Sequence, residues 1–96
     1  MRRAAKIDRN HTEVVKAFRT LGCSVLHLAA IGKGCPDIAV GKCSKTILVE
    51  IKDGSKPLSA RQLTKDEEKF HSEWLGGVFV VKDLSDVFAL VKGLER

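Results

Sequence analysis

The run TILVEIK at residues 46–52 is the feature that most constrains the fold of this chain. β-Branched residues dominate the first half of the run, which predicts a strand, and the loop-forming residues 53–57 end it. A helical pattern over 59–74 and a second apolar run over 78–81 follow, separated by two glycines. A strand, a helix and a strand in this order form a crossover unit, whose two strands lie parallel and are joined right-handedly. The unit therefore predicts an α/β domain.

The segments outside this unit predict the rest of the sheet. In chain order they are a helix over 12–21, strands over 24–28 and 37–40, and a last helix over 85–94. The short connections before residues 46–52 favour antiparallel pairing. The order is therefore α-β-β-β-α-β-α, which predicts a mixed four-stranded sheet flanked by helices. A chain of 96 residues has room for one such domain, over residues 1–96.

Charged residues stand in two of the predicted strands where apolar ones are expected. Glu50 and Lys52 share one face at the end of 46–52, although a strand in a crossover unit is usually apolar on both faces. Asp37 follows Pro36 and begins another otherwise apolar strand. In α/β sheets, ligands bind in the crevice beyond the strand ends. Two carboxylates there can hold Mg²⁺ or Mn²⁺, and a lysine adds positive charge where a phosphoryl transition state accumulates negative charge.

Each of these residues also has a structural explanation. Glu50 and Lys52 can form a partly exposed ion pair at a strand end, and Asp37 can serve as a turn residue after Pro36. Judged singly, these explanations are the simpler ones. As an ordered set, the three residues favour a chemical site.

The overall charge is positive, with 17 Lys and Arg against 12 Asp and Glu and a formal net charge of +5. A basic surface attracts polyanions, of which nucleic acid is the commonest, although solubility alone also favours such a charge. The chain has four Phe, one Trp and no Tyr, so contact with the nucleic-acid backbone is favoured over base stacking. Arg2, Arg3, Lys6 and Arg9 form a basic N-terminal arm that either tracks DNA or is disordered.

Composition also bears on the compartment and on the kind of metal site. No apolar stretch approaches the ~18 residues of a membrane span, and no signal peptide is recognised. A cytoplasmic protein without membrane association is therefore expected, in the host cytoplasm if the chain is viral. The three cysteines form no C-x-x-C pair, which favours reduced thiols over disulfides or a zinc ribbon. His27 is expected to face the core, whereas His11 and His71 are expected at the surface.

Residues 34–37, Gly-Cys-Pro-Asp, are followed by a hairpin and by Glu-Ile-Lys at 50–52, which resembles the PD-(D/E)XK signature of metal-dependent nucleases. The restriction-endonuclease-like core of that superfamily has the order α-β-β-β-α-β, which matches the order predicted above. Residues 53–62 resemble the virus-type replication-repair nuclease (VRR-NUC) family, in which a Gln opens the helix after the E-x-K strand. Glu13 sits where VRR-NUC domains and archaeal Holliday junction resolvases carry a further acidic residue. The resemblance covers nearly the whole chain, which looks like a single stand-alone VRR-NUC-like domain.

The resemblance implies a set of site residues for hydrolysing DNA phosphodiester bonds with Mg²⁺ or Mn²⁺. The implied catalytic residues are Asp37, Glu50, Lys52 and Gln62. The implied metal ligands are Glu13, Asp37, Glu50 and the backbone carbonyl of Ile51. Glu13 and Gln62 also lie three residues after Asn10 and Ser59, so both have the alternative of closing a capping box. The expected DNA contacts are Lys33, Lys56, Arg61 and Lys65.

The small size of the chain and its resemblance to junction resolvases together favour branched DNA as substrate, above all four-way junctions, cut by a two-fold dimer. The expected interface lies around Phe70, Trp74 and Val78. Two alternatives remain, a monomeric nuclease that cuts flaps or nicks and a non-catalytic DNA-binding module that keeps the nuclease fold. The intact set Asp37, Glu50 and Lys52 disfavours the second alternative, since a binding module is free to lose these residues. A sequence-specific restriction enzyme is disfavoured because no recognition insertion is present.

Overall fold

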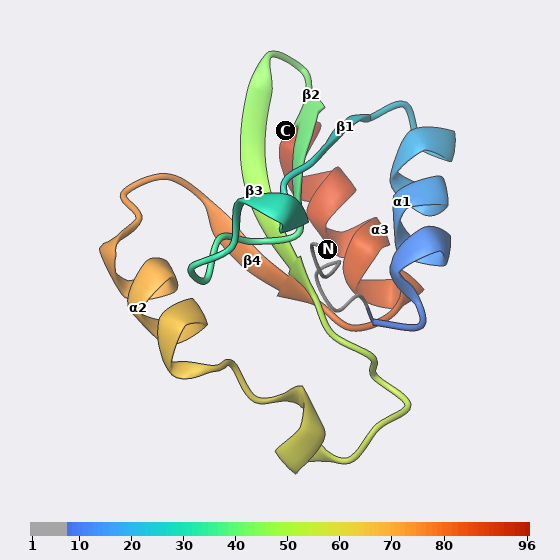
Figure 1. The fold of residues 1–96 in the computed structure, drawn as a ribbon. Coiled ribbons are helices and arrows are strands. Elements are labelled where there is room, and N and C mark those ends of the chain that lie inside the picture. The colour runs from blue at the N-terminus through green and yellow to red at the C-terminus, as the bar shows by residue number, and fades with distance from the viewer. Residues whose placement is uncertain (1–7) are drawn as a thin grey trace.

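The computed structural model describes residues 8–96, so Arg2, Arg3 and Lys6 of the basic arm lie outside the described residues. Two short 3₁₀ turns, Ala29–Ile31 and Leu58–Arg61, lie in the connections between the main elements. Figure 1 shows these elements, which are, in chain order, α1 (His11–Thr20), β1 (Ser24–His27), β2 (Ile38–Lys42), β3 (Lys45–Ile51), α2 (Lys65–Glu73), β4 (Val78–Val81) and α3 (Leu84–Leu94). The predicted order α-β-β-β-α-β-α is thereby confirmed.

The strands of the described chain form one mixed sheet in the order β1-β2-β3-β4. β2 pairs antiparallel with both β1 and β3, as the short connections predict. β3 pairs parallel with β4 across the connection that contains α2. The amide of Lys52 continues this parallel ladder by donating to the carbonyl of Val81 at 2.9 Å. The prediction of an α/β domain with a mixed four-stranded sheet is therefore confirmed.

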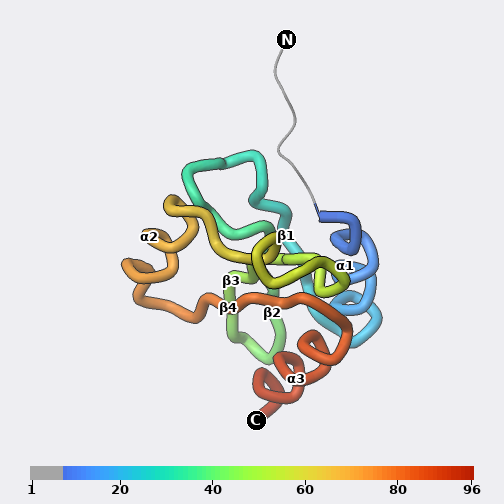
Figure 2. The backbone as a smooth tube through the Cα atoms, turned by 90° about the horizontal axis from the view of Figure 1, so that it is seen from below, coloured from blue at the N-terminus to red at the C-terminus, as the bar shows by residue number. Residues whose placement is uncertain are grey.

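The hydrophobic core lies between the sheet and the pair α1 and α3, which pack together on one of its faces (Figures 1 and 2). Helical spacing directs one stripe of each helix toward the sheet, and strand alternation supplies the facing side chains. The buried apolar residues of these elements are Val14, Val15, Phe18, Val87, Val91 and Leu94 from the helices and Ile38, Val40, Ile47, Val49, Ile51 and Val81 from the strands. Each such burial stabilises the fold by about 1.5–3 kcal/mol.

The opposite face of the sheet is thinly covered. α2 stands apart from α1 and α3 (Figure 2), and none of its residues is buried. Two apolar side chains of the outer strands, Leu26 and Val80, are 63% and 42% exposed. Because side chains alternate along a strand, Glu50 and Lys52 project on the face opposite to the core. The charged end of β3 therefore opens toward α2.

The helix predicted over 59–74 is shorter than expected and begins later. Residues 58–61 form a 3₁₀ turn, and the extended backbone of Gln62 (φ −69°, ψ 149°) separates this turn from α2. α2 begins after Thr64, whose hydroxyl accepts a hydrogen bond from the Glu67 amide while the Glu67 carboxylate accepts one from the Thr64 amide. This capping box forms in place of the one expected at Ser59, and its carboxylate in the first turn interacts favourably with the helix dipole.

The predicted positions of two histidines are reversed. His27, expected in the core, is exposed because β1 is an edge strand of the sheet. His11, expected at the surface, is only 8% exposed at the beginning of α1. The two imidazole rings stack, with their centroids 5.7 Å apart and their planes inclined by 23°.

Candidate active site

Two carboxylates meet where β3 ends. Ile38 pairs with Val49 in the antiparallel ladder, so the residues next outward, Asp37 and Glu50, come side by side on the same face. The Ile51 amide fixes the first of them by donating a hydrogen bond of 2.7 Å to Asp37 Oδ2. Glu50 is 4% exposed, which is rare for a carboxylate.

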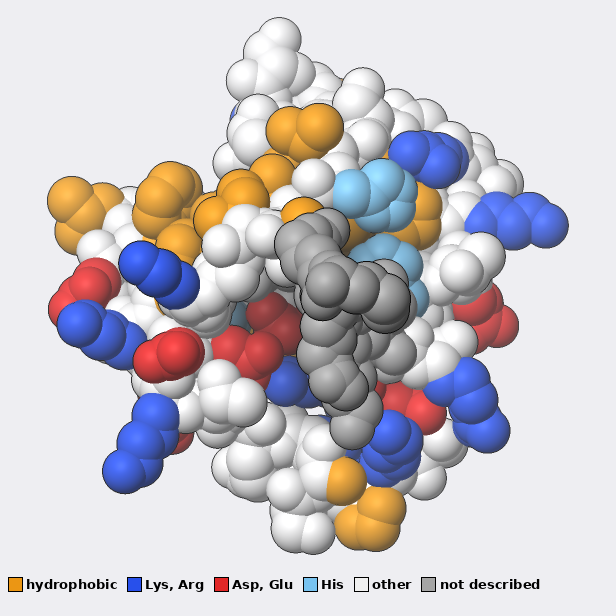
Figure 3. Space-filling view, in the orientation of Figure 1, with side chains coloured by type: hydrophobic (Ala, Val, Ile, Leu, Met, Phe, Trp, Pro, Cys, Tyr) orange, Lys and Arg blue, Asp and Glu red, His pale blue; other side chains and the backbone are white. Residues whose placement is uncertain are grey.

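Lys52 lies against these carboxylates and reaches a third one. Its Nζ is 3.8 Å from Glu50 Oε2 and 2.9 Å from Glu67 Oε1. The side chain of Lys52 is 12% exposed, and that of Glu67 is 17% exposed. We refer to Asp37, Glu50, Lys52 and Glu67 as the acidic pocket. Its cavity has a volume of about 410 Å³, and Figure 3 shows acidic side chains set deep near the centre of this face.

Glu67 is a pocket residue that the sequence analysis missed. Its Oε1 accepts hydrogen bonds both from Lys52 Nζ and from the Thr64 amide, each at 2.9 Å. The start of α2 is therefore tied directly to the end of β3. The signal that points to it is the sequence Thr64-x-x-Glu67, a capping-box pattern at the true helix start.

A glycine lets the loop before Asp37 approach the first turn of α2. Gly34 has φ +81°, and a Cβ atom there would overlap the backbone of Asp66 and Glu67. Only glycine combines this left-handed conformation with so close an approach. The loop that carries Asp37 and the helix that carries Glu67 thus support each other around the pocket.

Burial and like charges shift the pKa values in the acidic pocket. Burial, followed by the charges of Asp37 and Glu67, raises the pKa of Glu50 to about 9. Burial also raises the pKa of Asp37, although the hydrogen bond from Ile51 acts against it. Burial by itself would raise the pKa of Glu67, but the hydrogen bonds from Lys52 and Thr64 outweigh it and lower that pKa. At neutral pH Glu50 therefore keeps a proton, in hydrogen-bond contact with Asp37.

The pocket fits a hard divalent cation. Glu50 Oε1 is buried and has no hydrogen-bond partner among the described residues, and a second carboxylate lies beside it. No group of three or more His, Cys, Asp or Glu side chains in residues 8–96 is arranged to hold a metal ion by itself. Mg²⁺, however, is commonly bound by one or two carboxylates and fills its other positions with water and substrate oxygens. Asp37 and Glu50 supply that number.

The structure brings two further predicted side chains to the same place, since Gln62 and Lys56 line the acidic cavity. Ile51, whose carbonyl was the predicted metal ligand, contacts Asp37 through its amide and does not line the cavity. The side chain of Gln62 donates to the carbonyl of Leu58 at 3.2 Å, so the capping box with Ser59 is not formed. Asp8, which the sequence analysis did not single out, also lines this cavity.

Four predicted side chains do not line the acidic cavity. Glu13 is exposed on α1 and lines a different pocket. Lys33 lines a hollow beside α2, and Lys65 is exposed at the first residue of that helix. The guanidinium of Arg61 donates to the carbonyl of Lys56 at 2.8 Å. Glu13, which was predicted to be a metal ligand, therefore does not lie at the acidic cavity.

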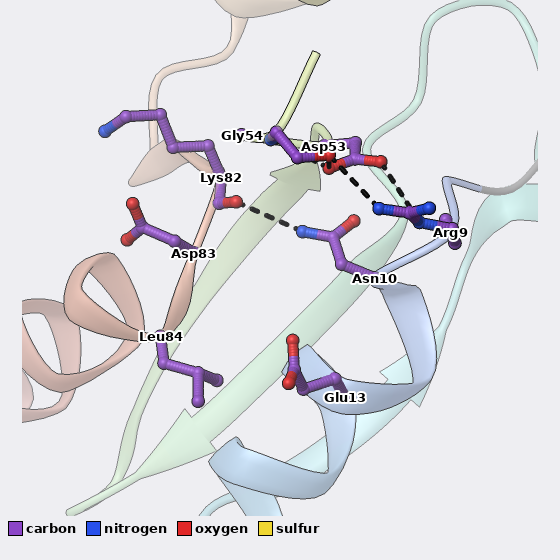
Figure 4. A pocket seen from close by; sticks show the side chains of 9 residues that line it. Arg9, Asn10, Glu13, Asp53, Gly54, Lys82, Asp83 and Leu84 are labelled. Atoms are coloured by element: carbon purple, nitrogen blue, oxygen red, sulfur yellow. Dashed lines mark hydrogen bonds and ion pairs between the residues drawn. The ribbon is translucent and has the colours of Figure 1, made fainter.

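The pocket that Glu13 lines is built from opposite charges (Figure 4). Arg9 Nε lies 3.7 Å from Asp53 Oδ2, and Asp53 Oδ1 accepts hydrogen bonds from the amide and hydroxyl of Ser55 at 2.9 and 2.7 Å. The amide group of Asn10 donates to the carbonyls of Lys52 and Lys82, both at 3.1 Å, and makes no cap on α1. We refer to Arg9, Asn10, Asp53 and Ser55 as the Arg9 pocket. Its contacts hold the start of α1 to the ends of β3 and β4.

The chain matches no protein-family model, no curated protein and no solved structure. Among the described residues, no helix combines the length and apolar character needed to cross a membrane. A functional proposal for this chain therefore depends on the geometry of the acidic pocket.

Proposed function

We propose that this chain is a metal-dependent endonuclease of the PD-(D/E)XK type, similar to VRR-NUC domains, which hydrolyses DNA phosphodiester bonds with Mg²⁺ or Mn²⁺. One observation carries the proposal. Two carboxylates, the half-buried Asp37 and the buried Glu50, are held side by side next to the ammonium of Lys52, and one buried oxygen of Glu50 lacks a partner among the described residues. Both carboxylates can ionise together only at a cost, so a ligand of positive charge is the group that would stabilise the pair.

Asp37 and Glu50 are the residues that would hold the cation. When bound there, a divalent metal would lower the pKa of a water molecule and polarise a phosphate oxygen. Asp37 is positioned for this by the hydrogen bond from the Ile51 amide, and Glu50 by its burial at the end of β3. The chain's own contribution is a rigid pair of oxygen ligands built on adjacent strands.

Lys52 supplies the positive charge for the reacting phosphate. Burial would lower its pKa, but the hydrogen bond and charge of Glu67 and the charge of Glu50 outweigh burial and raise it. The lysine therefore stays protonated and acts as a point charge rather than as a base. In the transition state it would stabilise the negative charge that develops on the phosphate oxygens.

The remaining residues around the pocket would position the substrate. Gln62 and Lys56 line the acidic cavity and would contact the DNA backbone next to the cleaved bond. Lys33, Arg61 and Lys65 lie in the neighbouring loop, the 3₁₀ turn and the start of α2, where they can contact phosphates farther along the strand. The formal net charge of +5 supports binding to a polyanion.

A panel of end-labelled four-way junction, flap, nicked duplex and linear duplex tests the proposal. Purified protein is expected to cut branched DNA in Mg²⁺ or Mn²⁺ and to stop when EDTA is added. Asp37→Ala should not cut, whereas Glu13→Gln, whose carboxylate lies in the other pocket, should cut at the wild-type rate. Cleavage that continues in excess chelator would contradict the metal dependence. Failure to cut any of the four substrates would contradict the nuclease and favour a DNA-binding module.

The proposed substrate is the four-way junction, and the proposed working form is a two-fold dimer. A junction must be cut in two opposed strands, and a two-fold dimer presents two equivalent acidic pockets.

An exposed apolar surface beside α2 supports a dimer (Figure 3, upper left). The rings of Phe70 and Trp74 stack with their centroids 5.3 Å apart. Trp74 is 47% exposed and Leu75 is 100% exposed. Light scattering should report twice the monomer mass, and Trp74→Glu, at the end of α2, should lower it while Ser72→Glu, within α2, does not. A monomer mass together with full junction cleavage would favour the flap- or nick-type enzyme.

A further inference from the structure

A groove of different character lies between α1 and the edge strand β1. Its volume is about 350 Å³, which is within the range of ligand pockets. The polar side chains that line it are His11, Thr12, Lys16, Arg19, Thr20 and His27. No carboxylate is among the described residues that line it. We refer to this feature as the imidazole groove.

The stacked histidine pair forms one wall of the imidazole groove. His11 is 8% exposed, and its Nδ1 is buried without a hydrogen-bond partner among residues 8–96. A buried imidazole nitrogen without a partner is costly unless a ligand or water completes it. His27 covers the other side of the stack and is exposed, so one ring is accessible from outside.

The other wall carries two positively charged side chains that form no ion pair with the described residues. Lys16 and Arg19 are three residues apart on α1 and therefore share a face of the helix. Both side chains are exposed, and no ion pair within the described residues involves either of them. Glu13, the acidic residue of α1, does not line the groove and lines two other pockets, one of which Lys16 also lines. The charged side chains of Lys16 and Arg19 in the groove itself are thus both positive.

The imidazole groove begins next to the acidic pocket. His27 pairs across the ladder with Ile38, which directly follows Asp37. The amide of Leu28 donates to the carbonyl of Asp37 at 2.8 Å, which fixes the end of β1 against the same residue. A strand of nucleic acid that has one phosphate at Asp37 therefore needs to advance only a short way along β1 to reach the groove.

We propose that the imidazole groove is a second, non-catalytic DNA site, which binds the backbone phosphates of the strand that continues from the acidic pocket. Lys16, Arg19 and the exposed imidazole of His27 would donate hydrogen bonds to phosphate oxygens, as such groups do in most protein–DNA contacts. The inference rests on the proposed function for its ligand, since DNA is the polyanion that the acidic pocket would act on. It assigns α1 the role of guiding the substrate.

Binding measured without cleavage tests the groove directly. A fluorescent four-way junction is titrated in EDTA with wild-type protein, the double variant Lys16→Gln/Arg19→Gln, and Lys92→Gln as a matched control on the exposed face of α3. The double variant should bind at least ~10-fold more weakly, and the slope of log K against log salt should fall by about 2 because two phosphate contacts are lost. Lys92→Gln should match the wild type. Circular dichroism of each variant verifies the fold.

The three histidines supply a second measurement that depends on no variant. In the NMR spectrum of the wild-type protein, addition of a short single-stranded oligonucleotide should shift the imidazole signals of His11 and His27. His71, which lies one helical turn after Glu67, reports separately on the acidic pocket. Inorganic phosphate at the same phosphate concentration should shift them less than the oligonucleotide does. Equal shifts would mean that a free anion, and not DNA, is the ligand.

The outcomes separate this inference from the proposed nuclease. If the wild type cuts DNA and the double variant binds as tightly as the wild type, the groove is not a DNA site and the nuclease stands. If the double variant loses affinity but the wild type never cuts DNA, the groove stands and the nuclease proposal is wrong. If the wild type binds no DNA at all, both are contradicted.

Discussion

Glu50 and Asp53 are buried carboxylates three residues apart, yet they lie in opposite electrostatic environments. Glu50 is 4% exposed in the acidic pocket, where its neighbours Asp37 and Glu67 are also acidic. Asp53 is 5% exposed in the Arg9 pocket, where Ser55 donates two hydrogen bonds to it and Arg9 lies alongside. The pKa of Glu50 is raised to about 9, whereas the Ser55 hydrogen bonds lower the pKa of Asp53.

The difference shows that Asp53 contributes to the stability of the fold, whereas Glu50 does not. The contacts of Asp53 link the end of β3 to Arg9, so its charge is stabilised within the protein. The ionised form of Glu50 would be stabilised by one lysine and opposed by two carboxylates, so Glu50 keeps its proton at neutral pH. Sites where like charges are buried together are typical of ligand binding and catalysis. The acidic pocket is therefore the functional candidate, although the Arg9 pocket is the larger cavity, at about 580 against 410 Å³.

The largest predicted effect comes from exchanging the two carboxylates for amides. Glu50→Gln should lower the single-turnover cleavage rate by at least ~10³-fold, because the metal loses one of two charged ligands. Asp53→Asn should leave that rate unchanged in the folded protein while lowering the melting temperature, because a buried charge network is broken. Both quantities are measured on the same preparations. Equal losses of rate in both variants would abolish the distinction between the pockets.

Lys52→Ala should have the next largest effect. The cleavage rate at saturating DNA should fall by ~10²-fold, a typical loss when one group that stabilises the transition state is removed. Affinity for the junction in EDTA should stay close to the wild-type value, because the 12% exposed lysine faces carboxylates rather than solvent. Loss of binding with an unchanged rate would make Lys52 a phosphate anchor instead.

Glu67→Gln should have a smaller effect on the rate, on the order of 10-fold, since the amide still caps α2 and still accepts from Lys52 but lacks the charge that orients the ammonium. The neighbouring exposed residue gives the matched control, because Glu68→Gln changes the same charge outside the pocket. A rate in Glu67→Gln equal to that of Glu68→Gln would reduce Glu67 to a helix cap.

The pH dependence of stability gives a further comparison, because the two carboxylates act in opposite directions. In EDTA the folded protein keeps the Glu50 proton up to about pH 9, whereas the unfolded chain releases it near its ordinary pKa of 4.5. Between these values the folded state binds more protons, so this contribution to the free energy of unfolding falls as pH rises. Glu50→Gln should remove that decline, which urea denaturation at several pH values measures.

Asp53 should show the reverse behaviour. Its folded pKa lies below the ordinary value of 3.8, so its contribution to stability is present above that pH and is lost as the pH falls through the folded pKa. The destabilisation caused by Asp53→Asn should therefore disappear in strong acid. A destabilisation that persists unchanged below pH 3 would mean that the side chain acts through packing and not through charge.

The order of elements and the meeting of Asp37 with Glu50 could be predicted from the sequence. Strand alternation and the short hairpin fix which residues oppose each other, and both depend on local pattern. The pairing of Ile38 with Val49 bears this out. The alternation of residues along the strands is therefore enough to predict that Asp37 and Glu50 lie close together.

Glu67 and Glu13 show where such reasoning fails. Two capping patterns compete between residues 59 and 67, and the choice between them depends on contacts with Lys52 that no local pattern contains. Glu13 lies on a helix whose rotation is set by the burial of Val14 and Phe18, and that rotation directs its carboxylate toward the Arg9 pocket. Positions that depend on how separate elements pack could not be derived from spacing alone.

Calorimetric titration with Mn²⁺ tests the central claim, that the acidic pocket is a metal site, most directly. Wild-type protein and Asp53→Asn should bind Mn²⁺ equally and release a proton at neutral pH, because the cation displaces the proton held by Glu50. Glu50→Gln should bind at least ~10-fold more weakly and release none. Two buffers of different ionisation enthalpy measure the proton release. Equal binding by Glu50→Gln and the wild type, or no binding by either, would contradict the account.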